Sequence, residues 1–170
     1  MKKLFAVIFA LGMVLALTAC GKAPIKLVTT SANGISMDVP SDFGTFEDKN
    51  GVMVAVSKEG TATISVSVIG DGAGSTPADI DQDTYQKQSY PGNNNVEIVK
   101  YDNAASCNGI PAVSAVCKVK DSNGTVLTAY SFLLFYEDGT VQSVSINYNA
   151  NENSSTKDNI DAIVKSIKVK

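Results

Sequence analysis

The chain has 170 residues, with 14 basic and 17 acidic side chains, a formal net charge of −3, and no histidine. Without histidine it can form neither a Ser-His or Cys-His nucleophile pair nor a His-liganded zinc site. All its basic residues are lysines, so it lacks the arginine-rich basic face typical of nucleic-acid binding. Composition therefore excludes several common catalytic classes and disfavours nucleic acid as a partner.

The N-terminal segment has the pattern of a secretory signal peptide. Lys2 and Lys3 precede an apolar run over residues 4–17. This run is shorter than the roughly 20 residues that a helix needs to span a bilayer. A buried core helix is the alternative, but the run has no polar face. We therefore expect residues 1–19 to be removed, and we exclude them from reasoning about the fold.

Four residues at the end of this segment, Leu17-Thr18-Ala19-Cys20, resemble the lipobox of bacterial lipoproteins. The resemblance implies that the Cys20 thiol receives a diacylglyceryl group and that a peptidase cuts between Ala19 and Cys20. Two acyl chains anchor a protein stably, whereas one holds it only reversibly. Residues 20–24 then form the lipidated N-terminus and a short tether. An ordinary cleaved signal with an incidental Cys20 is the alternative.

The mature chain, residues 20–170, has a length that suits one domain. Removal of residues 1–19 takes away two of the 14 basic residues and leaves 12 lysines against 17 acids, a net charge of −5. Anionic lipid headgroups would repel such a chain. The lipid on Cys20, rather than a basic patch, is therefore expected to hold the protein at the membrane.

Apolar and polar residues alternate through most of the mature chain, which predicts a protein made mainly of strands. Asn108-Gly109 is a strong signal for a two-residue hairpin turn. Residues 132–136 are apolar on both faces, so their strand should lie inside the sheet. The expected strands cover residues 25–30, 35–39, 52–57, 61–69, 96–107, 110–120, 125–136 and 140–149.

A first helix is expected to begin at Thr76 and to continue to about Ser89. Pro77 stands at the first helical position, where its missing N–H costs nothing, and Asp79 stands at the capping-box position. The residues before it, Gly70 to Ser75, match neither common phosphate-binding pattern and are read as a plain loop.

A second helix is expected over residues 156–167, with Ser154 or Ser155 as its N-cap. Its apolar residues recur at three- and four-residue steps, which predicts one face packed on the sheet. No internal repeat and no second domain is evident.

Acidic residues from Asp79 to Asp83 resemble the start of a calcium-binding loop. The rest of that pattern fails, because Thr84 stands where glycine is needed and Tyr90 where a bidentate glutamate is needed. Acids in a first helical turn also suit the helix dipole. We therefore favour a helix start and leave weak divalent binding as the alternative.

Six tyrosines could form an aromatic recognition surface or could line the core of a sheet with their hydroxyls at its edge, the interpretation that we favour. They are Tyr85, Tyr90, Tyr101, Tyr130, Tyr136 and Tyr148.

A disulfide between Cys107 and Cys117 is conceivable outside the cytoplasm, but the predicted hairpin disfavours it. Cys107 should lie opposite Ile110, and position 117 is then roughly 23 Å along the strand, on the other face. We expect two free thiols, with Cys117 on a core face beside Val113, Ala115 and Val119.

Three segments resemble the PsbP-like fold of small bacterial lipoproteins: "ISMDVPSDF" (35–43), "NGIPAVSAVCKV" (108–119) and "IDAIVKSIKVK" (160–170). The resemblance implies a single α+β domain over residues 25–170, with a central antiparallel sheet flanked by helices. Relatives serve as binding or assembly modules: one branch binds a small GTPase and another serves photosystem assembly. No functional residues carry over from the family.

The sequence thus predicts a non-enzymatic, lipid-anchored module on the extracytoplasmic face of a bacterial membrane, with an envelope protein or component as its partner. It predicts no cofactor beyond the lipid on Cys20 and no catalytic or metal site. The alternative is a small-ligand or metal-binding lipoprotein associated with a transporter. A hydrolase that uses carboxylates alone has the least support, since no carboxylate pair stands out.

Overall fold

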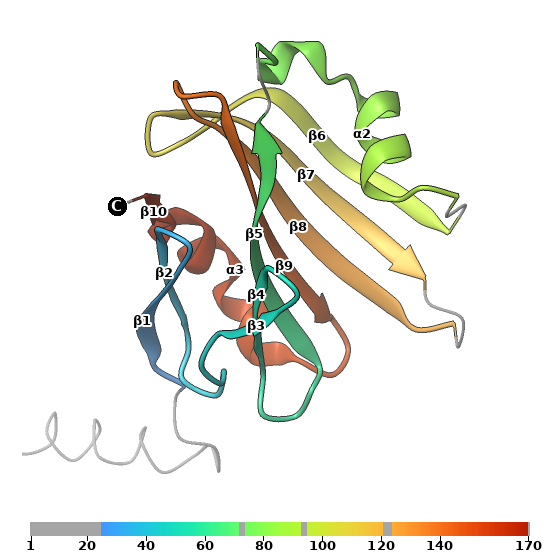
Figure 1. Cartoon of the computed structure of the whole chain (residues 1–170). Coiled ribbons are helices and arrows are strands. Elements are labelled where there is room, and N and C mark those ends of the chain that lie inside the picture. The colour runs from blue at the N-terminus through green and yellow to red at the C-terminus, as the bar shows by residue number, and fades with distance from the viewer. Residues whose placement is uncertain (1–24, 72–73, 93–94, 121–123, 170) are drawn as a thin grey trace, which may run out of the picture.

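A computed structural model describes residues 25–71, 74–92, 95–120 and 124–169 (Figure 1). The predicted signal peptide, the lipobox from Leu17 to Cys20 and the tether lie outside these residues. In the described part, no helix is long and apolar enough to cross a membrane. The elements are β1 (Leu27–Ala32), β2 (Ile35–Pro40), β3 (Glu47–Lys49), β4 (Val52–Val56), β5 (Ala62–Asp71), the 3-10 helix η1 (Pro77–Asp79), α2 (Gln82–Ser89), β6 (Val96–Cys107), β7 (Ile110–Lys120), β8 (Val126–Phe135), β9 (Thr140–Asn149), α3 (Ser154–Ser166) and β10 (Lys168–Val169).

A seven-stranded antiparallel sheet forms most of the domain, in the order β3-β4-β5-β9-β8-β7-β6. β8 lies between β9 and β7, which confirms the interior strand predicted from its two apolar faces. The predicted α+β class with one large antiparallel sheet is therefore confirmed, although only two α-helices of the described part of the chain pack on that sheet.

The β6–β7 hairpin has the turn and the register expected from Asn108-Gly109. Asn108 and Gly109 have φ values of 50° and 86°, as a turn of this hand requires, and Cys107 pairs with Ile110. The Asn108 side chain also donates a hydrogen bond to the carbonyl of Ile167. The hairpin turn is therefore tied to the end of α3.

A second, three-stranded sheet, ordered β1-β2-β10, was not predicted. In it β10 pairs with β2 through Ser36 and Ile35. β10 has two residues and β3 has three, so neither is long enough to show an alternating pattern. The predicted central antiparallel sheet is thus accompanied by a second, smaller one.

α3 begins two residues earlier than predicted, and its N-cap is Asn153 rather than Ser154 or Ser155. The Asn153 Oδ1 accepts from the Thr156 amide at 2.8 Å, while its Nδ2 donates to the Thr61 hydroxyl at 3.0 Å. Asparagine caps helices as well as serine does. The second contact also links the start of α3 to the start of β5.

The helix predicted from Thr76 to Ser89 is interrupted. Asp79 accepts from the Thr76 amide at 2.8 Å, as expected of a capping box, but η1 ends at Asp79. Asp81 is then extended (φ −82°, ψ 171°) and caps α2 by accepting from the Thr84 amide at 2.7 Å. Two capping acids so close together start two short helices instead of one.

The two faces of the large sheet differ in what covers them (Figure 1). We call the face under α3 and the small sheet the inner face, and the face under α2 the outer face. The inner core is aliphatic and includes Ile35, Met37, Ile64, Val66, Leu134, Val144, Ile146, Ile163 and Ile167. The outer cluster contains Tyr85, Val113, Ala115, Cys117, Ala129, Phe135 and Val141, with Val119 packed against it, as predicted for the Cys117 side of β7.

Candidate functional site

Small polar side chains occupy the outer face of the three neighbouring strands β5, β9 and β8. Alternate residues of a strand share a face, so Ser65 and Ser67 of β5 lie on one side together with Ser143 and Ser145 of β9. Pairing aligns them: Ser65 lies opposite Ser145, which lies opposite Ser131 of β8. Rows of hydroxyl groups therefore cross the sheet where aliphatic residues would ordinarily be packed.

α2 covers only part of this face, because its sequence QDTYQKQS supplies one buried side chain, Tyr85. The Tyr85 ring packs against two other tyrosine rings. The distance between ring centroids is 6.4 Å to Tyr90, in an edge-on arrangement, and 5.7 Å to Tyr101, in a tilted one. The segment before α2 is held by the Ile80 carbonyl, which accepts from the Tyr101 hydroxyl and from the Asn103 Nδ2. A small number of contacts thus fixes α2 above the sheet.

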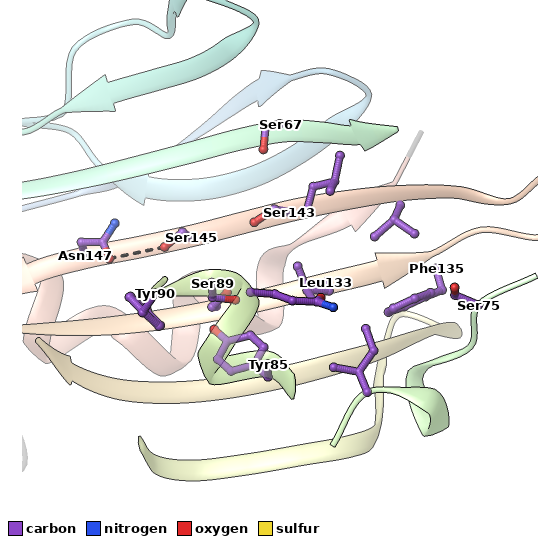
Figure 2. A pocket seen from close by; sticks show the side chains of 15 residues that line it. Ser67, Ser75, Tyr85, Ser89, Tyr90, Leu133, Phe135, Ser143, Ser145 and Asn147 are labelled. Carbon is purple, nitrogen blue, oxygen red and sulfur yellow. Dashed lines mark hydrogen bonds between the residues drawn. The ribbon is translucent and has the colours of Figure 1, made fainter. Parts of the chain in front are cut away.

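Between α2 and the serine rows lies a cleft of about 590 Å³ (Figure 2). This volume is within the range of small-molecule sites. A β-bulge between Val68 and Gly70 leaves Ile69 exposed at its wall. Among the described residues the lining carries no Asp, Glu or Lys; it consists of Ser67, Ile69, Ser75, Ile80, Tyr85, Gln88, Ser89, Tyr90, Ser131, Leu133, Phe135, Val141, Ser143, Ser145 and Asn147.

The Tyr85 side chain is 1% exposed, and its hydroxyl has no partner in hydrogen-bond geometry. Burial raises the pKa of this phenol, and Ser131 lies near enough to oppose that shift in part. Most buried hydroxyls in proteins do have a partner. The unmade hydrogen bond at the cleft is therefore an unusual feature of this chain.

Burial likewise raises the pKa values of Tyr90 and Cys117, whose side chains lie close to Tyr85. These groups are therefore neutral near pH 7. A cleft with neutral tyrosines and no ionised side chain among its described lining offers hydrogen bonds and apolar contact, with little capacity for acid–base chemistry.

The predicted sites are distributed as follows. Asp79 and Asp81 are both engaged in capping, and their hydrogen bonds to backbone amides lower their pKa values. Within the described residues no group of three or more His, Cys, Asp or Glu side chains is placed to hold a metal ion. The acids between residues 79 and 83 thus mark helix starts, as favoured from the sequence.

The six tyrosines do not form one surface. Tyr85, Tyr90 and Tyr101 belong to the outer cluster, whereas Tyr130, Tyr136 and Tyr148 belong to the inner core. The Tyr130 and Tyr148 rings stack on the inner face, with their centroids 6.4 Å apart. Three of the tyrosines therefore approach the cleft, and only Tyr85 and Tyr90 line it.

Cys107 and Cys117 are both free and buried. Cys107 packs in the inner core and Cys117 in the outer cluster, so the sheet itself lies between the two thiols. Cys117 pairs with Ile98, far along the hairpin from Cys107.

Sequence reasoning did not find the cleft. Its signal is the alternation of serines in three segments, 65–67, 131 and 143–145, which come together only through strand pairing. Alternation alone identifies these residues as one face of each strand. It does not reveal that a short helix leaves that face partly uncovered.

The architecture defines a class: it is a PsbP-like α+β fold. No family model and no curated protein matches the sequence. Solved structures do resemble the chain, and the three described next are all below 25% identity, so they bear on the fold alone.

Cyanobacterial PsbP (CyanoP) from Synechocystis sp. PCC 6803 has a TM-score of 0.60 at 16% identity, covering 91% of this chain and 99% of its own. The Saccharomyces cerevisiae Ran-binding protein Mog1p has a TM-score of 0.58 at 14% identity, and the match covers 85% of this chain and 96% of Mog1p. Protein PA94 of unknown function from Pseudomonas aeruginosa has a TM-score of 0.53 at 8% identity, and the match covers 85% of this chain and 98% of PA94.

Proposed function

We propose that this protein is a non-catalytic binding module held at the extracytoplasmic face of a bacterial membrane by a diacylglyceryl lipid on Cys20. The support for the anchor is Leu17-Thr18-Ala19-Cys20 at the end of a lysine-led apolar run. The mature net charge of −5 makes direct attraction to anionic headgroups unfavourable, so the lipid would carry the attachment.

The observation that carries the binding role is the uncharged cleft on the outer face. It has the size of a ligand site, convergent polar groups and aromatic side chains, and its described lining residues include none of the carboxylates that a hydrolase would need. The resemblance to Mog1p, described as Ran-binding, adds that this fold can serve recognition. The partner proposed here is a protein or other component of the bacterial envelope.

The anchor is tested by replacing Cys20→Ala, with Cys107→Ala as a matched cysteine control. Cells are labelled with radioactive palmitate, fractionated and analysed by immunoprecipitation. The parent and the control should be labelled and membrane-bound. C20A should carry no label and should either run as a longer precursor or leave the membrane. Undiminished labelling of C20A would contradict the anchor.

The binding role is tested by crosslinking in intact cells, followed by capture of the protein. Recovery of one dominant envelope component with the parent, reduced with a cleft variant such as Ser143→Asp, is the expected result. S143D places a charge in the neutral cleft without touching the inner core. Recovery of nothing, or equal recovery with S143D, would count against binding through this cleft.

The size of the cleft also favours a second candidate, a small-ligand lipoprotein that serves a transporter. Neighbouring genes for a permease and an ATPase would support this role. In that case a purified transporter reconstituted with the protein should transport its substrate faster than without it.

A further inference from the structure

We propose that the cleft between α2 and the outer face of the large sheet binds a neutral saccharide. This inference rests on the binding half of the proposed function and is independent of the lipid anchor. It assigns a chemical class of ligand to a cleft so far described only by its shape and lining.

The charge of the lining selects a neutral ligand. None of its described residues is Asp, Glu or Lys, although the chain as a whole carries 17 acidic and 14 basic residues. An ionised ligand would lose water on entering and would find no opposite charge to replace it. Phosphorylated, carboxylated and cationic ligands are therefore all disfavoured.

The polar groups of the cleft suit a ligand that carries many hydroxyls. Serine hydroxyls and the amides of Asn147 and Gln88 both donate and accept hydrogen bonds, as sugar hydroxyls do. Neighbouring strands are spaced at about 4.8 Å, and alternate residues of one strand at roughly 6.6 Å. Ser67, Ser143 and Ser145 thus form a grid of half-buried hydroxyls that can contact several ligand oxygens at once.

Apolar side chains lie beside the serines in the cleft. Leu133 of β8 pairs with Ser143 of β9, Phe135 follows on the same face of β8, and Tyr90 at the end of α2 also lines the cleft (Figure 2). Sugar rings have C–H faces as well as hydroxyl edges, and amphipathic aromatic side chains match such a surface. A lining in which hydroxyls lie beside apolar side chains corresponds to the two kinds of surface on a pyranose ring.

The unpartnered Tyr85 hydroxyl is a second observation that points to a ligand. Its side chain lines the cleft, is 1% exposed and makes no hydrogen bond with its hydroxyl. α2 is attached by few apolar contacts, so a small displacement of this helix would let a ligand hydroxyl reach the phenol. A bound saccharide would make the hydrogen bond that the nearby Ser131, Ser89 and Tyr90 hydroxyls do not make in this arrangement.

Calorimetric titration of the purified lipidated protein tests the proposal, in a detergent without a sugar headgroup. The neutral probes are trimers of N-acetylglucosamine, glucose (α- and β-linked) and mannose; the charged probe is a galacturonic acid trimer. We expect saturable binding of at least one neutral trimer and at least tenfold weaker binding of the charged one. No binding by any neutral trimer, or equal binding of the charged one, overturns the proposal.

Two matched substitutions then locate the site. Tyr85→Phe removes only the unpartnered hydroxyl, so we expect Tm to stay or rise while saccharide affinity falls at least fivefold. Tyr130→Phe makes the same chemical change on the inner face and should leave affinity unchanged. Equal affinities for Y85F and the parent, or an equal loss in Y130F, would overturn the assignment of the site.

Free sugars and wall glycans share this chemistry, and co-sedimentation with purified cell-wall glycan separates them. Pelleting with the glycan, blocked by the soluble trimer, identifies the polymer as the source; binding of the trimer without pelleting identifies a free sugar. If peptides bind and no saccharide does, the ligand class is wrong. A partner captured by crosslinking would then still support the proposed binding module. Failure of both the crosslinking capture and the saccharide titration would contradict the binding module itself.

Discussion

The inner and outer faces of the large sheet are built from alternate residues of the same strands, yet along β5 and β9 they have opposite compositions. Along β9, Val144 and Ile146 point into the inner core, while Ser143 and Ser145 point to the cleft. α3 contributes two buried isoleucines to the inner face and its C-cap Ile167 a third, whereas α2 contributes Tyr85 alone to the outer face. Burial of apolar surface, the main source of stability, is therefore concentrated on one side.

This difference separates the tasks of folding and recognition. The inner face needs close packing and tolerates little change, because a core void has few ways to relax. The outer face keeps polar groups half exposed, so they can exchange water for another partner. Matched substitutions on the two faces should therefore differ in their effect on stability.

The largest effect is expected from paired isoleucine substitutions. Ile163→Ala opens a cavity beneath α3, where this side chain is fully buried, and should lower the free energy of unfolding by about 2–5 kcal/mol. Ile69→Ala, at a side chain that is 57% exposed in the cleft wall, should change it by less than about 0.5 kcal/mol. Urea denaturation followed by circular dichroism measures both, and equal losses would contradict the separation.

The second-largest difference is expected between the stability costs of removing the N-caps of α3 and α2. Asn153→Ala removes the N-cap of α3 and its bond to Thr61, and should cost about 1–2 kcal/mol. Asp81→Ala removes the cap of α2 and should leave global unfolding unchanged while amide exchange in α2 accelerates. Hydrogen exchange resolved by residue tests this, and slower opening of α2 than of α3 in D81A would argue against it.

Alkaline pH should destabilise the protein progressively. Burial raises the pKa values of Cys117, Tyr85 and Tyr90 in the folded state, so above pH 9 the unfolded state loses protons that the folded state retains. Stability is complete below the unfolded pKa values and is lost as pH rises toward the folded ones. Thermal melts from pH 7 to 11 should show a falling Tm, with a smaller fall in Cys117→Ala than in the parent.

The smallest effect is expected at the edge strand β3. Lys49 and Glu47 form an ion pair at 2.6 Å, but both side chains are more than 60% exposed. Water and salt screen such pairs, so Lys49→Ala should leave Tm unchanged within error. A clear drop in Tm would show that the edge contributes more than its exposure indicates.

Much of the sheet could be predicted from the sequence because its signals are local. The strands β6 and β7 were placed at their observed ends by alternation and by Asn108-Gly109. By contrast, β10 and β3 are too short to show a period. The break at Ile80 depends on Asp81 acting as a second cap, and on two β6 side chains that reach the Ile80 carbonyl.

The cleft was beyond sequence reasoning for a different reason. Its serines come from strands separated by up to about 80 residues of chain, and strand order decides whether they meet. The hydroxyl of Tyr85 adds a feature that no local pattern contains, since it consists of a bond that is not made.

The pairing of β10 with β2 affects how much of the protein can fold during its synthesis. Lys168 and Val169 pair with Ser36 and Ile35, and the Asp38 amide donates to the Ser166 hydroxyl at 2.8 Å. The pairing of β2 with β10 can therefore form only after residues near 169 have been synthesised, and contacts this distant in sequence form slowly. Until then the small sheet is incomplete and the nascent chain is not fully folded. Polypeptides pass through narrow export channels in such an incompletely folded state.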